Sequence, residues 1–390
     1  MAKLGDICNI LNGYAFKSEK YVDSGIRVIR ITNVQKGYIE DVDPKFYSIE
    51  YSDELSKYML ENGDLLMSLT GNVGRVGILS DKFLPAALNQ RVACLRLKGN
   101  EIFKPFLFHF LNSDYFEQMC INSSNGIAQK NLSTEWLKEV YIPEYSKGQQ
   151  KQIAANLDKV THTIDLCNAI LEKLDLLVKS RFVEMFGEPI SNSMGWECCE
   201  LGDCLESIDN GKSYVCDNDC RTGDNPAILK LSAVTYGIYK PDENKAMIDE
   251  DLFDESAEVK DNDLLFTRKN TPELVGMSAY VFSTPQKLMM PDLIFRLNAK
   301  ASCNKIYLWQ LINHDLFRPC IQNIANGSAK SMSNISKERL SKLTIPVPPL
   351  ALQKKFAAFV EQTDKSKLAV KQVLEKAETL KKALMQEYFG

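Results

Sequence analysis

Residues that could perform acid–base or nucleophilic chemistry are few and scattered in this chain. Its three histidines are His109, His162 and His314, and none lies in an H-E-x-x-H helix or beside a G-x-S-x-G turn. The sequence also lacks the Asn-Pro-Pro-Tyr or Asp-Pro-Pro-Tyr element that adenine methyltransferases use, and the paired acids followed by lysine of a nuclease core. We therefore expect no catalytic residues.

Cysteines and glycines offer two further kinds of site. The chain has 11 cysteines, an odd number, with a local group at Cys198, Cys199, Cys204, Cys216 and Cys220. That group lacks a C-x-x-C pair and a neighbouring histidine, so we expect reduced thiols and no metal site.

The glycine-rich run 71–77 is the one segment that resembles a nucleotide-binding loop. It lacks the Lys-Ser/Thr of a phosphate loop, and a strand-like segment rather than a helix follows it. We interpret the run as a turn or hairpin.

The elements that must position any site occur twice, about 200 residues apart. Leu4-Gly5-Asp6 recurs as Leu201-Gly202-Asp203, and Asp64-Leu65-Leu66 recurs as Asp263-Leu264-Leu265. Later pairs keep the spacing: Leu132-Ser133 with Ile335-Ser336, Ile142-Pro143 with Ile345-Pro346, and the Glu-x-Phe-Gly ends at 184–187 and 387–390. Each copy begins with strand-like segments and ends in a long helical tail.

The two tails carry apolar residues at alternating spacings of three and four, which indicates a helix-pairing seam. We expect the seam residues to be Ile153, Leu157, Val160, Ile164, Leu171, Leu174, Val178, Phe356, Val360, Val370, Leu374 and Leu384. Lys367 and Lys381 interrupt the second seam. Helices of this length reach roughly 55 Å at 1.5 Å per residue, and packing on each helix's own globule is the alternative interpretation.

These patterns predict an α+β protein with an internal twofold pseudo-repeat. Two similar α/β globules are separated by two long antiparallel coiled-coil helices. The predicted segments are globules at 1–148 and 197–349, helices at 149–186 and 350–390, and a linker at 187–196.

Composition and charge limit the class of protein. The 390 residues predict two or three domains, and 45% hydrophobic with 25% charged residues is ordinary for a soluble globular protein. We see no signal-like or membrane-spanning apolar run and expect a cytoplasmic protein. The net charge of −4 predicts weak DNA binding by the chain alone, because phosphate contacts require local positive charge.

The order of these segments resembles that of type I restriction-modification specificity subunits. The resemblance rests on the Leu-Gly-Asp starts, the Gly-Asp-Leu-Leu and Asn-Asp-Leu-Leu segments, the run 87–92, the Ile-Pro closures and the heptad tails. It covers essentially the whole chain.

In that family each globule is a target-recognition domain that reads one half of a split site in double-stranded DNA, and the helices set the spacer. The resemblance implies a subunit with no cofactor of its own and two methyltransferase partners that carry S-adenosylmethionine. Two restriction subunits that use ATP and magnesium are possible further partners. Because the two globules differ in sequence, it implies an asymmetric site.

Residues that suit base edges and phosphates form groups in both globules. In the first globule the candidates are Arg30, Thr32, Asn33, Ser68, Thr70, Asn72, Arg75, Asn89, Gln90 and Arg91. In the second, which lacks both the Gly-rich turn and the Asn-Gln-Arg run, they are Lys230, Ser232, Arg268, Lys269, Asn270 and Thr271. Each is also a plausible solvated loop or capping residue.

Three alternatives stay open from the sequence. The chain is compatible with a specificity subunit of a methyltransferase-only system, which would modify DNA without a nuclease. It is also compatible with a coiled-coil scaffold that does not read DNA. Methyl transfer or DNA cutting by the purified chain would identify a third case, an enzyme.

Overall fold

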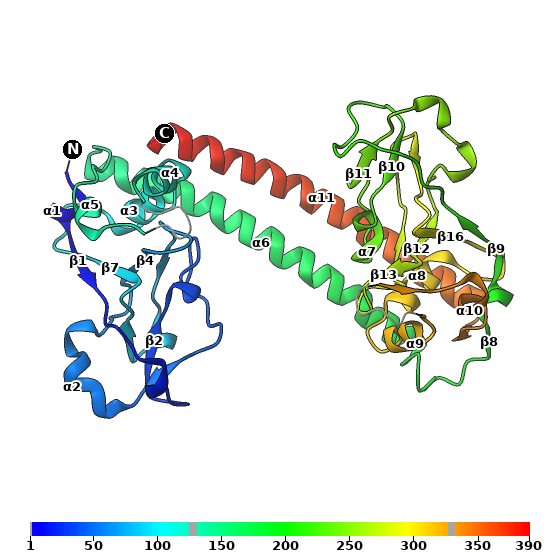
Figure 1. Cartoon of the computed structure of the whole chain (residues 1–390), viewed down its shortest axis with the longest axis horizontal. Helices are drawn as coiled ribbons and strands as arrows, with labels where there is room; N and C mark the ends of the chain where they lie inside the picture. The colour runs from blue at the N-terminus through cyan, green and yellow to red at the C-terminus, as the bar shows by residue number, and fades with distance from the viewer. Residues whose placement is uncertain (1, 125–130, 327–331) are drawn as a thin grey trace. The chain divides into compact units, whose positions relative to one another are not determined.

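Each half of the chain folds a four-stranded antiparallel sheet and a three-stranded mixed sheet (Figure 1). The computed structural model describes residues 2–124, 131–326 and 332–390. In the first half the strand orders are β1-β7-β4-β5 and β3-β2-β6. The bounds are β1 Cys8–Asn12, β2 Ile26–Ile29, β3 Phe46–Tyr47, β4 Leu65–Ser68, β5 Val76–Ile78, β6 Ala86–Leu88 and β7 Val92–Leu97.

The second half repeats both sheets as β9-β16-β12-β14 and β11-β10-β15. Their bounds are β9 Leu205–Asn210, β10 Ala227–Leu229, β11 Asn244–Ala246, β12 Leu264–Thr267, β14 Ser278–Tyr280, β15 Leu288–Met289 and β16 Ile294–Ala299. Two short ladders pair β8 Cys198–Glu200 with β18 Thr344–Pro346, and β13 Lys269–Asn270 with β17 Ser333–Asn334. The predicted internal repeat is confirmed by this matching strand order.

Short helices flank the sheets, and one long helix ends each half. The first half has α1 Leu4–Ile7, α2 Ser52–Leu55, α3 Lys104–Leu111, α4 Asp114–Ser123, α5 Thr134–Lys138 and α6 Lys147–Phe186. The second half has α7 Ser232–Thr235, α8 Lys305–Asn313, α9 Arg318–Asn323, α10 Lys337–Ser341 and α11 Leu350–Phe389.

The central strands β4 and β12 are apolar because both of their faces are covered. Leu65 packs in a core with the helices, whereas its neighbour Leu66 packs in a second core toward the smaller sheet. Leu264 and Leu265 divide in the same way in the second half. Successive strand residues point to opposite faces, so continuous apolar strands require two cores.

The chain forms two compact units, each with one globule and part of both long helices. One unit holds 1–168 with 371–390, and the other holds 169–370. In the first, Phe389 of α11 packs on Phe106 of α3, with ring centroids 5.5 Å apart. In the second, Phe186 of α6 packs on Tyr307 of α8 at 4.9 Å.

The antiparallel pairing follows from these contacts, because the start of each long helix shares a unit with the end of the other. The predicted seam residues of α6 and α11 are all buried or half-buried. Lys367, which interrupts the seam, forms an ion pair with Asp175 of α6. The pairing of individual seam residues and the five-segment division of the chain stay predictions, since the compact units divide both helices.

A buried glutamine ties the start of each long helix to its globule. The Gln150 side chain accepts from the Phe103 amide at 2.8 Å and donates to the Tyr145 carbonyl at 2.9 Å. Gln353 repeats both bonds with Asn304, at 2.9 Å, and Pro348, at 2.7 Å. Both bonds of each glutamine go to backbone groups that would otherwise lack partners near a buried helix start.

Candidate nucleic-acid interface

The first candidate group lies where the loop after β4 passes the turn between β6 and β7. The Leu69 amide donates to the Arg91 carbonyl at 2.9 Å, and the Ser68 amide donates to the Arg75 carbonyl at 3.0 Å. These bonds bring Ser68, Thr70, Asn72 and Arg75 beside the turn that contains Arg91. The glycine run therefore forms the predicted hairpin, between β4 and β5.

The second candidate group joins the first through the small sheet. Strands β2 and β6 are parallel, so Arg30 and Asn89 follow the same end of the sheet. The Asn89 amide donates to the Ile29 carbonyl at 3.2 Å. Arg75 reaches the same region, where its guanidinium donates to the Gln35 side chain at 2.6 Å.

Two of these candidates use their side chains to hold the protein backbone. Buried Ser68 donates to the Asn72 carbonyl at 2.5 Å and accepts from the Arg75 amide at 3.1 Å. Buried Asn33 accepts from the Arg30 amide at 2.9 Å and donates to the carbonyls of Glu40 and Val42. Their predicted DNA contacts stay untested, but shaping the loops is the role that this geometry supports.

The remaining first-globule candidates are more accessible. Thr32, Asn72, Gln90 and Arg91 are exposed, and Arg30, Thr70, Arg75 and Asn89 are half-buried. Within the described ranges, the side chains of Asn72, Gln90 and Arg91 make no hydrogen bond to the protein. These three are free to bind a ligand.

One of the half-buried cations already has an acidic partner. Arg30 pairs with the Asp43 carboxylate at 3.2 Å. Lys45, and then Arg30, hold the pKa of exposed Asp43 below its ordinary value. The positive charge of Arg30 is thus partly neutralised before any phosphate approaches.

In the second globule the two candidate groups are joined by a side-chain bond. Buried Asn270 donates to Thr235 of α7 at 3.1 Å, which ties the loop after β12 to the segment that begins at Lys230. Ser232 donates to Glu243 at 2.7 Å. Lys269 is half-buried and Thr271 is exposed, so these two remain accessible.

Cations occupy different backbone positions in the two loops. The Arg268 amide donates to the Leu293 carbonyl at 2.9 Å. The equivalent bond in the first globule runs from the Leu69 amide to the Arg91 carbonyl. The second globule therefore carries Leu293 where the first carries Arg91. Its arginine lies in the loop itself and stacks over Phe295 with its guanidinium 5.2 Å from the ring centroid. The two globules present positive charge in different patterns.

The second globule lacks a glycine-rich turn, as the sequence indicates, but it retains one turn glycine at the equivalent position. Gly276 donates to the Thr267 carbonyl at 2.9 Å, and Gly74 donates to the Ser68 carbonyl at 3.0 Å. Both adopt positive φ, +75° and +84°. The intervening segment is longer and contains one glycine instead of several, which concealed the match in sequence.

Two asparagines that the sequence reasoning missed lie beside the candidate loops. Asn131 bridges to Thr70, and Asn334 pairs with Lys269. Their position one residue before Leu132-Ser133 and Ile335-Ser336, a pair that repeats in the sequence, is the signal that marks them. Among the described residues, the buried hydroxyl of Thr70 and the side-chain oxygen of Asn334 have no hydrogen-bond partner.

Two cysteines of the local group lie close together in the structure. Cys199 and Cys204 lie 3.6 Å apart through their sulfurs. Burial raises the pKa of Cys199 to about 12, which keeps the thiol protonated.

Over the described ranges we find no group of three or more His, Cys, Asp or Glu side chains placed to hold a metal. Nor does any described helix have the length and apolar character needed to span a membrane.

Comparison with known proteins identifies a family over most of the chain. Residues 1–176 and 194–379 each match the model of the type I restriction modification DNA specificity domain. The chain is 23% identical to the EcoKI specificity subunit of Escherichia coli K12, over 93% of this chain and 81% of that one. It is 31% identical to the EcoEI specificity subunit of Escherichia coli over 45% of this chain, and spans only 30% of that relative's length.

A solved structure has the same fold. The crystal structure of the S subunit of a type I restriction-modification system from M. genitalium superposes with a TM-score of 0.63, at 12% identity. The match covers 100% of this chain and 95% of that one. Since the two domain matches together cover most of its length, this chain belongs to the family of proteins with the type I restriction modification DNA specificity domain.

Proposed function

We propose that this chain recognises a bipartite, asymmetric DNA site and positions partner subunits there. The observation that carries the proposal is the repeated fold with unlike cation patterns, Arg75 and Arg91 in one globule against Arg268 and Lys269 in the other. A repeated scaffold suits two half-sites, and different side chains on it suit different bases.

The partners follow from the family. Two methyltransferase subunits would carry S-adenosylmethionine, and two restriction subunits, where they are present, would use ATP and magnesium. This chain would bind none of these cofactors, and its place of action would be the cytoplasm, where the DNA is. With a net charge of −4, binding of DNA by the chain alone should be weak, so the assembled complex is the species to test.

The primary experiment is methylome sequencing of a methylation-null host that expresses the neighbouring methyltransferase subunit with and without this chain. We expect a split, asymmetric motif that appears only when both are expressed. A motif that is unchanged by this chain, with both proteins folded, would favour the scaffold alternative. A nuclease gene beside this one distinguishes a restriction system from a methyltransferase-only system.

Two substitutions then assign the half-sites. Arg91→Ala should weaken binding of the assembled complex to its site by about 1–3 kcal/mol, and Lys269→Ala by a similar amount through the other half. Fluorescence anisotropy on duplexes with one or the other half-site scrambled measures which half each variant has lost. Exposed Lys57, which lies outside both candidate groups, provides the matched control Lys57→Ala. Equal binding by all three variants would remove these residues from the interface.

A further inference from the structure

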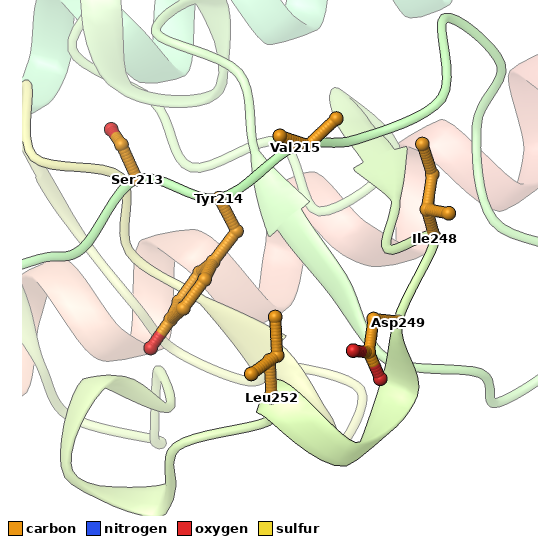
Figure 2. Close-up of a pocket in the computed structure, with 6 residues that line it drawn as sticks. All are labelled: Ser213, Tyr214, Val215, Ile248, Asp249 and Leu252. Carbon is orange, nitrogen blue, oxygen red and sulfur yellow. The ribbon is translucent and has the colours of Figure 1, made fainter.

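An apolar hollow opens on the second globule. The residues that line it lie outside the candidate DNA-binding segments of the sequence. It has a volume of about 430 Å³ and is lined by Ser213, Tyr214, Val215, Ile248, Asp249 and Leu252. Figure 2 shows that these side chains come from two segments, one after β9 and one after β11. Both segments belong to the same compact unit.

The apolar side chains that line the hollow are largely exposed to solvent. Val215 is 80% exposed, Ile248 66% and Leu252 48%. Single exposed apolar residues are ordinary, but a group of them around one hollow is typical of an interaction surface. The hollow is therefore a candidate to be covered by another molecule.

The corresponding part of the first globule is filled by its own aromatic residues. Gly13 and Gly211 occupy equivalent turns, because in each case a backbone oxygen lies in the space that a Cβ atom would need. Phe16 and Tyr214 each follow their glycine by three residues, so these two aromatic residues correspond. Phe16 packs edge-on against Tyr47 with centroids 4.8 Å apart, and Tyr21 and Tyr51 pack on the same ring.

The second globule replaces that aromatic cluster with a smaller one. Tyr214, Cys216 and Phe253 pack against a core that contains Met247, which leaves Val215 and Ile248 uncovered. The exposed apolar lining formed by Val215 and Ile248 is thus a feature of the second globule. An occupant of this hollow would be bound once per chain.

Charge decides which kind of molecule suits the hollow. Asp249 lines the hollow, and the segment Asp249–Glu258 that begins there contains six acidic residues and no lysine, arginine or histidine. Lys212, the neighbour of Ser213 in the chain, is already paired with Asp254, one of these six. Such a rim repels DNA phosphates and attracts cationic side chains.

We propose that this hollow, defined by Tyr214, Val215, Ile248 and Leu252 with its acidic rim, seats a segment of a methyltransferase subunit. The segment carries an apolar side chain flanked by lysines or arginines. The choice of partner rests on the function proposed above. Because aromatic residues fill the corresponding part of the first globule, one of the two methyltransferase copies gains this contact and the other does not, so the two copies bind with unequal affinity.

The test is calorimetric titration of the purified methyltransferase subunit into the full chain, at low and high salt. For the wild type we expect two binding events. Ile248→Ser should weaken one event about tenfold and leave the other unchanged. Replacing Glu250 and Asp251 together by lysine should weaken the same event and reduce its salt dependence, because the rim charge is reversed.

Ile238→Ser is the matched control, because Ile238 is 50% exposed in the same globule but does not line the hollow. It should leave both events unchanged. Two equal and unaltered events in Ile248→Ser would overturn the proposal, and so would a loss of DNA affinity without a loss of subunit affinity. Failure of the wild type to bind the subunit at all would instead contradict the proposed function.

Discussion

At the residue scale, burial separates the polar side chains that shape the candidate loops from those that can reach a ligand. Asn33 and Ser68 are polar residues like Asn72 and Arg91, and no feature of residue type distinguishes them. Their hydrogen bonds to nearby backbone groups do. A buried polar group without such a partner is destabilising, so these two side chains serve the fold.

His109 yields a prediction at this scale. Its imidazole is buried and lies 2.7 Å from Asp158, and burial lowers the pKa of His109 despite the opposing effect of that carboxylate. The unfolded chain, with a histidine pKa of about 6.5, therefore takes up the proton first as the pH falls. The stability that neutral His109 contributes above a pH of about 6.5 should therefore be lost as the pH falls below that value.

The measurement is the urea midpoint from circular dichroism between pH 7 and pH 5, for the wild type and His109→Gln. We expect the wild-type midpoint to fall more steeply over this range, because glutamine cannot take up the proton. His314, whose pKa burial also lowers, is present in both proteins, so its contribution cancels. Parallel pH profiles would show that His109 does not titrate differently on folding.

At the element scale, each candidate loop depends on one glycine with positive φ beside a helix. A Cβ on Gly74 would lie 2.9 Å from the Cys120 Cβ, and a Cβ on Gly276 would lie 2.3 Å from Ile321. The loop thus packs against α4 in the first globule and α9 in the second. A side chain at either glycine would therefore displace this close contact.

The pair Gly71 and Gly74 tests that requirement. Both have positive φ, but a Cβ on Gly71 would meet nothing within 4 Å. Gly71→Ala should cost about 1–2 kcal/mol of unfolding free energy from backbone strain alone. Gly74→Ala should cost a further 1–3 kcal/mol, because the added methyl group overpacks the contact with Cys120. The unfolding free energies are measured by chemical denaturation. Equal losses in the two variants would mean that α4 shifts to accommodate the added methyl group without loss of stability.

At the scale of the whole molecule, each long helix begins in one compact unit and ends in the other. Phe389, nearly at the end of the chain, is buried among Phe106 and Phe110 of the first unit. Phe186 is buried by Tyr307 and Phe356 in the second. The first unit is therefore completed by residues distant in sequence, whereas the second is one continuous segment, 169–370.

Removing either aromatic should destabilise one unit selectively. Phe389→Ala should lower the stability of the unit containing 1–168 by about 3 kcal/mol, and Phe186→Ala that of the unit containing 169–370 by a similar amount. Hydrogen exchange with mass spectrometry resolves the two units, and each variant is the control for the other. Uniform loss of protection across both units in either variant would contradict the selective effect.

The sequence by itself determined the repeat and the heptad spacing of the two long helices, and it carried the resemblance to the family. Those signals are visible in the residue types, because short motifs recur about 200 residues apart and apolar residues alternate at spacings of three and four. Only the tertiary structure decided that Gly276 corresponds to Gly74, that Leu293 stands where Arg91 does, and that Asn33 and Ser68 point inward. These properties depend on hydrogen bonds and packing between segments far apart in the chain, and no local pattern of residue types records them.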